Sequence, residues 1–289
     1  MKSRELLNEG AFYLKERGVE EAELNSQLIL SYLFGKEKFR LYLDEEGVSS
    51  SEEERFWQYL KKRGSFYPLQ YLIGSAPFFN FEFLAREGAF IPRPETEILV
   101  EAALNKIQNS KFKIQNDLKI LDLCAGSGNI GITLSLLSKS KVWLTDISES
   151  ALSLARENAR RLGVENRVIF KKGNLFEPVN DFSFDLILSN PPYIPSSEIR
   201  NLPEEVGREP RISLDGGKEG LFLIRRIIRE APFYLRKKGF LIFEIGYNQA
   251  ESVKNYISEN NLLYLEEIIP DYQGIPRVVI VKKHGEDSY

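Results

Sequence analysis

The sequence predicts an α/β protein in which a small all-helical N-terminal domain precedes a doubly wound, mainly parallel sheet. From Leu118 onward, short apolar runs typical of strands alternate with helical patterns, as expected for strand–helix units. Before residue 76, apolar residues recur only at helical spacing. With 289 residues, 43% of them hydrophobic, the chain is long enough for one large and one small domain.

The first domain is predicted to span residues 1–76 as a small helical bundle with solvated charges. A substrate-docking role for this domain is the functional interpretation, and the two are compatible. Ser51 followed by Glu54 indicates a capping box that opens a third helix. Two earlier helices are indicated by apolar residues at helical spacing: Leu6, Leu7, Ala11 and Leu14, then Leu24, Leu28, Ile29 and Tyr32.

A β-hairpin linker is predicted over 77–92, because aromatic residues alternate there before a turn at Arg86-Glu87-Gly88 and a second apolar run. Pro92 and Pro94 then end the strand. A helix follows over 95–107, with acidic residues in its first turn, and 109–117 reads as a loop.

The third region, 93–289, carries the alternating pattern. Strands are predicted over 119–126, 141–147, 167–174, 184–190, 239–246, 262–274 and 275–283. Helices are predicted over 130–137, 148–163, 218–239 and 247–261. Because only a short loop joins the last two strands, we expect one of them to run antiparallel.

Composition excludes several classes of site. The only cysteine is Cys124 and the only histidine is His284 in the polar C-terminal tail, so an internal disulfide, a Cys-His or Ser-His-Asp site and a zinc site are all disfavoured. A net charge of −3 argues against non-specific nucleic-acid binding. We find no signal-peptide core and no membrane-spanning run, and we expect a cytoplasmic monomer without a metal.

A glycine-rich loop follows the first strand of the alternating region. Gly126, Gly128 and Gly131 match G-x-G-x-x-G, and Asp146 ends the next strand. Such glycines let a backbone approach a nucleotide-like ligand closely, and an acid at that position accepts hydrogen bonds from a ribose diol. The alternative is a tight turn that needs only positive φ angles.

Asp122, on the same first strand, helps to choose between a dinucleotide and S-adenosylmethionine. A carboxylate would repel a pyrophosphate but would suit the amine of a methionine moiety. Asp122 therefore favours S-adenosylmethionine, unless it only braces the loop.

A second loop, Asn190-Pro191-Pro192-Tyr193, ends the fourth strand and should lie beside the glycine loop. The prolines donate no N–H and fix the backbone, so the carbonyls of Asn190 and Pro191 and the Asn190 side-chain oxygen are expected to act as acceptors. Such a loop suits a planar NH₂ group, against which Tyr193 packs. Acceptors that hold a poorly nucleophilic nitrogen in line with an activated methyl need no histidine base. A proline-rich turn without function is the plainer alternative.

Eight segments carry a resemblance to a known family: PLQYLIG (68–74), FIPRPETE (90–97), DLCAGSGNIG (122–131), TDIS (145–148), GNLF (173–176), SNPPYI (189–194), EPRISLDGGKEGL (209–221) and DYQGIPRVV (271–279). Over nearly its full length the chain resembles the release factor glutamine methyltransferases of the HemK/PrmC family. The resemblance implies a seven-stranded, Rossmann-like class I methyltransferase domain that uses S-adenosylmethionine. It also implies that the substrate is the glutamine, methylated at N5, of the Gly-Gly-Gln loop of class I peptide release factors, whose role in translation termination is thereby modulated.

The same resemblance implies roles for individual residues. Asn190 to Tyr193 bind the target glutamine, and Asn190 also lies near the methyl group. The implied cofactor-binding residues are Phe90, Asp122, Cys124, Ala125, Gly126, Ser127, Gly128, Asp146, Ile147, Asn174, Leu175 and Asn190. Two departures are present: the family often has Asp at position 174 and Thr at position 125.

Three other functions share some of these motifs. An N-methyltransferase acting on DNA or rRNA amino groups shares both loops, but no basic cluster supports it. A NAD-dependent oxidoreductase shares the glycine loop, but neither Asp122 nor Asn190-Pro-Pro-Tyr193 serves hydride transfer. A catalytically silent protein that binds S-adenosylmethionine would leave the second loop unexplained.

Overall fold

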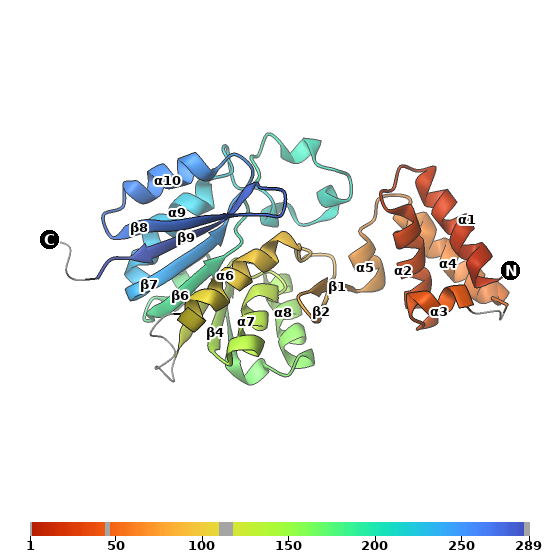
Figure 1. The fold of residues 1–289 in the computed structure, drawn as a ribbon, viewed down its shortest axis with the longest axis horizontal. Coiled ribbons are helices and arrows are strands. Elements are labelled where there is room, and N and C mark those ends of the chain that lie inside the picture. The colour runs from red at the N-terminus through yellow and green to blue at the C-terminus, as the bar shows by residue number, and fades with distance from the viewer. Residues whose placement is uncertain (1, 44–46, 110–117, 286–289) are drawn as a thin grey trace. The chain divides into compact units, whose positions relative to one another are not determined.

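The computed structural model describes residues 2–43, 47–109 and 118–285. The chain divides into two compact units (Figure 1). The first comprises Met1–Ser75 with Pro203–Arg208, and the second comprises Ala76–Leu202 with Glu209–Tyr289. The hairpin predicted as a linker thus belongs to the second unit, and no sequence signal indicated that Pro203–Arg208 joins the first.

The first unit is helical, as predicted. Its helices are α1 (Ser3–Lys15), α2 (Ala22–Phe34), α3 (Lys38–Leu43), α4 (Ser50–Arg63) and α5 (Leu69–Ile73). Leu6, Leu14, Ile29, Phe56 and Leu60 form its buried core. In α2 the buried face comprises Asn25, Ser26, Ile29 and Leu30, so Leu24, Leu28 and Tyr32 lie at its margin or in solvent.

The capping box of α4 lies two residues before the predicted one. Ser49 is the N-cap, its hydroxyl accepts from the Glu52 N–H, and the Glu52 carboxylate accepts from the Ser49 N–H at 2.9 Å. The run of three serines and three glutamates, 49–54, contains this spacing in three registers. Burial of Phe56 and Leu60 selects the register that starts at Ser49.

Arg63 fastens the segment Pro203–Arg208 within this unit. The Arg63 side chain is only 6% exposed. Its Nε donates to Asn25 Oδ1 at 2.6 Å, and its Nη2 donates to Glu205 Oε2 at 2.7 Å. A buried guanidinium needs such partners, because an unpaired one would carry a large desolvation cost.

The described residues of the second unit form a seven-stranded sheet of order β5-β4-β3-β6-β7-β9-β8 (Figure 1). Pairing is parallel from β5 to β7, and β9 is antiparallel to both β7 and β8. This confirms the prediction that one closing strand is reversed. The strands are β3 (Lys119–Leu123), β4 (Lys141–Asp146), β5 (Val168–Lys172), β6 (Phe184–Ser189), β7 (Leu235–Glu244), β8 (Leu263–Pro270) and β9 (Pro276–Lys283).

Helices cover both faces of this sheet. Alternate strand residues such as Ile120, Leu144 and Leu188 pack with α6, α7 and α8 on one face. Their neighbours Leu121 and Trp143 pack with α9 and α10 on the other. The helices are α6 (Glu95–Asn109), α7 (Asn129–Ser138), α8 (Glu149–Arg161), α9 (Phe222–Tyr234) and α10 (Ala250–Ser258). Apart from Asn109, the loop predicted at 109–117 lies outside the described residues.

The hairpin turns earlier than predicted. Its strands are β1 (Ser75–Phe78) and β2 (Phe81–Leu84), joined by Phe79-Asn80 with Phe79 at φ 54°. The predicted turn at Arg86–Gly88 exists, since the Ala89 N–H donates to Arg86 O, but it follows the hairpin. The second apolar run, Ala89–Ile91, forms no strand because Ala89 packs on α8 and the Ile91 N–H donates to Glu209.

The helix predicted over 218–239 is shorter, and the strand after it begins earlier. Pro232 removes the N–H that would bond to Ile228 O, and Asn260 Nδ2 donates to that carbonyl instead, at 3.1 Å. Leu235 is already extended and pairs with Phe184 on β6. Pro232 thus lies inside the last turn, and the helix ends two residues after it at Tyr234.

Candidate active site

Three neighbouring strands bring the predicted site residues to one edge of the sheet. Leu123 is the register partner of Thr145 on β4 and of Ser189 on β6. The loops that follow these strands therefore begin side by side, at the carboxyl ends where α/β proteins bind ligands. Ser189 Oγ donates to Leu123 O at 3.0 Å and joins two of the loops.

The glycine loop, Cys124–Gly128, connects β3 to α7. Cys124, Gly126 and Gly128 have φ angles of 56°, 56° and 82°, so three of its five residues are left-handed. A Cβ on Gly128 would lie 2.7 Å from Ile132 Cδ1, whereas one on Gly126 would meet nothing within 4 Å. Gly128 is thus favoured both by its positive φ and by close packing, and Gly126 leaves open space on the loop.

Asp146 fastens the glycine loop from the end of β4. Its Oδ2 accepts from the Gly126 N–H and its Oδ1 from the Ser148 N–H, each at 2.8 Å. Burial raises the pKa of Asp146, while these backbone donors oppose the rise. Asp146 is partly buried and its carboxylate retains free lone pairs, and Ile147 beside it is 50% exposed.

Asp122 lies beneath the loop, fully buried. Its Oδ2 accepts from the Gly131 N–H at 2.9 Å, and among the described residues its Oδ1 has no hydrogen-bond partner. Burial raises the pKa of Asp122 to about 8, so the carboxyl is largely protonated at neutral pH. These contacts correspond to the bracing alternative, and contact of Asp122 with a cofactor remains a prediction.

The other predicted cofactor residues in the glycine loop are largely enclosed. Ala125 is buried and its N–H donates to Thr145 O at 3.1 Å. Ser127 is buried with an unpartnered Oγ, and its carbonyl accepts from Asn158 Nδ2. Burial raises the pKa of the Cys124 thiol far above its usual range, so this thiol is not a nucleophile.

Asn174 and Leu175 follow β5, where the Gly173 N–H donates to Asp146 O. Leu175 is buried with φ 53°. Arg226 Nη1, from α9, donates to Asn174 Oδ1 at 3.2 Å. An aspartate at this position would pair more strongly with Arg226, so the departure from the common family residue replaces a local ion pair by a neutral hydrogen bond.

Phe90 lies in the segment that leads from the hairpin to α6. It is half-buried, and the Arg93 guanidinium lies 4.8 Å from its ring centroid. Arg93 pairs with the buried Glu209, which also accepts from the Ile91 N–H. The segment is therefore anchored, but the described contacts do not join Phe90 to the glycine loop.

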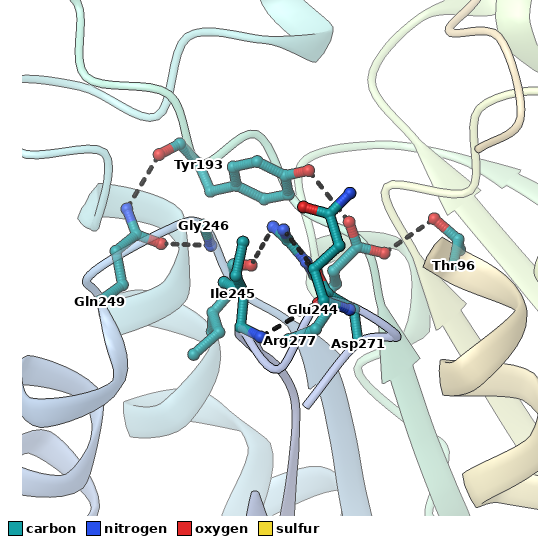
Figure 2. A network of polar contacts seen from close by, with 10 residues as sticks. Thr96, Tyr193, Glu244, Ile245, Gly246, Gln249, Asp271 and Arg277 are labelled. Atoms are coloured by element: carbon teal, nitrogen blue, oxygen red, sulfur yellow. Dashed lines mark hydrogen bonds and ion pairs between the residues drawn. The ribbon is translucent and has the colours of Figure 1, made fainter. Parts of the chain in front are cut away.

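The Asn190–Tyr193 loop is held by side chains and close backbone packing. Asn190 Nδ2 donates to Thr96 Oγ1 at 3.0 Å, and within the described part of the chain no donor reaches Asn190 Oδ1. Pro191 and Pro192 are buried. Tyr193 Oη donates to Glu244 Oε1 at 3.0 Å (Figure 2). Its burial among these groups raises the pKa of Tyr193 well above the usual value.

The segment 214–221 supports the backbone of this loop. A Cβ on Gly216 would lie 2.7 Å from Pro192 O, and one on Gly220 would overlap Tyr193 O. Gln249 Nε2 donates to Tyr193 O at 2.9 Å (Figure 2). The glycines of the LDGGKEGL segment therefore permit close approach of two backbones.

Sequence reasoning missed Thr96, Glu244 and Asn158. Glu244 is an acid at the end of an apolar strand, the same signal that identified Asp146. Thr96 lies in the FIPRPETE segment, but the sequence analysis gave it no role. Asn158 Oδ1 accepts from the Leu84 N–H at 2.7 Å and so joins the hairpin to the glycine loop, and nothing in the helical pattern of α8 indicated this.

The described residues contain neither a metal site nor a membrane-spanning helix. Within 2–43, 47–109 and 118–285, no group of three or more His, Cys, Asp or Glu side chains could hold a metal ion. No helix in these ranges combines the length and apolar character needed to cross a membrane.

Comparisons with known proteins give matches in both units of the chain. Residues 5–74 match the family model described as PrmC N-terminal domain, and residues 96–204 match the one described as Methyltransferase small domain. A release factor glutamine methyltransferase from Moorella thermoacetica is 35% identical, covering 99% of this chain and 100% of its own length. One from Geobacter sulfurreducens is 37% identical, covering 96% and 95%.

Solved structures show the same fold at low identity. The hMettl16 catalytic domain, in complex with MAT2A 3'UTR hairpin 6, has a TM-score of 0.58 at 13% identity and covers 83% of this chain and 84% of its own. A methyltransferase from Pyrococcus furiosus has a TM-score of 0.52 at 16% identity, covering 72% and 91%.

The predicted class I methyltransferase fold is thus confirmed. The two family models match the two units in chain order. The Moorella thermoacetica relative aligns with 99% of this chain and 100% of its own length. The chain belongs to the release factor glutamine methyltransferase family.

Proposed function

We propose that this protein transfers the methyl group of S-adenosylmethionine to N5 of the glutamine in the Gly-Gly-Gln loop of class I peptide release factors. The observation that carries the proposal is the hydrogen bonding of the Asn190 side chain. Its Nδ2 is occupied by Thr96, so its Oδ1 is left as an acceptor beside the glycine loop. An acceptor there suits an amide NH₂ donor, and the relatives that span the whole chain are named for glutamine methylation.

The glycine loop fits the cofactor in three respects. Gly126 borders open space, so a ligand approaches its backbone without a clash. Asp146 keeps free lone pairs for ribose hydroxyls while two backbone donors hold it in place. Ser127 Oγ and Asp122 Oδ1 are buried polar atoms without partners under the loop. Cys124 to Gly128 would hold the methionine end, and Asn174, Leu175 and Ile147 would border the adenosine.

When bound, the cofactor supplies an electrophilic methyl group. The protein's part is to orient a glutamine nitrogen whose lone pair is delocalised into the amide. Asn190 Oδ1 and the adjacent backbone carbonyls would accept from its two hydrogens. As the nitrogen gains positive charge, those hydrogen bonds strengthen, which lowers the barrier through differential binding. Alignment of the two reactants supplies the rest.

The helical unit would contribute to recognition of the release factor. An open groove of about 630 Å³ lies along α1 and α4, lined by residues that include Phe12, Tyr13 and Trp57. Phe12 is 65% exposed, so this groove presents an aromatic side chain to a partner. The groove supports the predicted docking role of this unit.

The test is a methyl-transfer assay with radiolabelled S-adenosylmethionine. A class I release factor from the same source is compared with its Gly-Gly-Gln glutamine-to-alanine variant. We expect label on the first factor alone. Label on neither, with cofactor binding intact, would contradict the proposal, and ribosomal RNA and genomic DNA would then be tested as substrates.

A further inference from the structure

A continuous hydrogen-bond chain joins the two ends of the Asn190–Tyr193 loop through residues outside it. Asn190 Nδ2 donates to Thr96 Oγ1 at 3.0 Å, and Thr96 Oγ1 donates to Glu244 Oε2 at 2.7 Å. Tyr193 Oη donates to the other carboxylate oxygen, Oε1, at 3.0 Å. Figure 2 shows Glu244 between Thr96 and Tyr193. Thr96 and Glu244 are each only 1% exposed.

The direction of every proton in this chain follows from the chemistry of its members. When Glu244 is ionised it only accepts, so both Thr96 and Tyr193 donate to it, as in the two contacts described above. Thr96 has a single hydroxyl proton, so its oxygen accepts from its other neighbour. Asn190 must therefore turn its NH₂ toward Thr96, which leaves Oδ1 as the atom facing away from it.

We propose that Thr96 and Glu244 are positioning residues that fix the orientation of the Asn190 amide, so that its oxygen and not its nitrogen meets the substrate. This inference rests on the proposed function. A reversed amide would present a donor to the donor NH₂ of glutamine, and the two groups would repel. Neither Thr96 nor Glu244 needs to touch the substrate.

The surroundings of Glu244 act on its pKa in opposite directions, and the net shift is upward. Burial raises the pKa of Glu244, and the nearby Glu95 adds to the rise. The hydrogen bonds from Thr96 and Tyr193 and the positive charge of Arg277 oppose it. Arg277 is itself fixed, because it donates to Asp271 Oδ2 at 3.0 Å and to Ile245 O at 3.1 Å (Figure 2).

Once Glu244 is protonated, the orientation of the Asn190 amide would no longer be fixed. A carboxylic acid donates one hydrogen bond, so Thr96 would then be free to donate to Asn190 and the amide could reverse. Because the carboxylate is the active form, kcat should fall as the pH drops through the Glu244 pKa. Burial sets this pKa together with four neighbouring groups: Thr96, Tyr193, Arg277 and Glu95.

The main test compares Thr96→Val with Thr96→Ser. Valine matches the shape of threonine but lacks the hydroxyl, whereas serine keeps it. We expect Thr96→Val to lower kcat by about 10- to 100-fold with the cofactor Kd unchanged, and Thr96→Ser to recover most of the loss. The matched control is Thr133→Val in α7, because the Thr133 hydroxyl is buried without a partner, and kcat should stay within twofold.

A readout without substrate separates this inference from the proposed function. The side-chain NH₂ of Asn190, labelled with ¹⁵N and assigned with Asn190→Asp, should exchange slowly with solvent in the wild type and in Thr96→Ser. In Thr96→Val it should exchange at least tenfold faster. This result would support the positioning role even if the protein methylated no release factor.

Glu244→Gln provides a second variant should Thr96→Val fail to fold. Whichever way the new amide turns, one of Thr96 and Tyr193 loses its acceptor, so kcat should fall and the acidic limb of its pH profile should disappear. Equal activity of Thr96→Val and wild type, or equal losses in Thr96→Val and Thr96→Ser, would overturn the inference. So would unchanged exchange of the Asn190 amide.

Discussion

The glycine loop and the Asn190–Tyr193 loop are each held in a fixed conformation, but by different contacts. Each follows a parallel strand, and each has a buried acid behind it. Asp122 holds a backbone N–H and leaves one oxygen unpaired, whereas Glu244 holds two side-chain hydroxyls with both of its oxygens. The glycine loop is shaped by left-handed backbone conformations and by the Asp146 carboxylate. The backbone of the Asn190–Tyr193 loop packs closely on Gly216 and Gly220, and a chain of side chains additionally orients Asn190.

This difference predicts different consequences of mutation. Changes in the glycine loop should act on folding and cofactor affinity, because its geometry is built from φ angles and glycine contacts. Changes in the second loop should act on turnover, because its geometry sets the direction of hydrogen bonds toward the substrate.

Asn190→Ala should have the largest effect. Loss of the acceptor that becomes stronger in the transition state should lower kcat by at least about 100-fold, or about 3 kcal/mol, while S-adenosylmethionine binds as in the wild type. Steady-state kinetics and calorimetric titration measure the two quantities. Asn166→Ala is the control, since Asn166 is exposed in the short helix Glu165–Arg167. Unchanged turnover would remove the role assigned to the loop.

Gly128→Ala tests whether the glycine loop is held by packing. The new Cβ would lie 2.7 Å from Ile132 Cδ1 at a φ of 82°, so we expect a loss of about 2–3 kcal/mol in the free energy of unfolding. Gly163→Ala separates the two causes. Gly163 has φ 71° but nothing within 4 Å, so it should lose only the backbone part, about 1 kcal/mol. Equal losses in urea unfolding would show that packing contributes nothing.

Asp146→Ala should affect the cofactor before it affects catalysis. The carboxylate fixes Gly126 and Ser148, and it is the predicted partner of the ribose. We expect the Kd for S-adenosylmethionine to rise about 10- to 50-fold, with kcat at saturating cofactor reduced much less. Asp181→Ala, at an exposed position, should change neither. A variant with wild-type cofactor affinity would contradict the assignment.

More of the glycine loop than of the hydrogen-bond chain behind Asn190 was predicted from the sequence. Gly126, Gly128 and Asp146 were identified because spacing along the chain reflects local geometry. Thr96 and Glu244 are 148 residues apart, and their pairing depends on how α6 packs against β7. Element types were predicted from periodicity, but the start of α4 and the end of α9 were misplaced. Core contacts of Phe56 and the pairing of Leu235 with Phe184 on β6 decide those positions.

Asp122→Asn tests the glycine-loop side of the comparison through pH. Burial raises the pKa of Asp122 from 3.8 to about 8, so between these values the folded state keeps a proton that the unfolded state has released. The stabilisation from this proton is complete below pH 3.8 and is lost as the pH rises through 8. The wild type should therefore lose about 1.4 kcal/mol per pH unit relative to Asp122→Asn across this window. Asparagine keeps the acceptor for Gly131 and never ionises. Urea unfolding at pH 5, 6, 7 and 8 measures the difference, and parallel profiles would mean that Asp122 is already ionised beneath the loop.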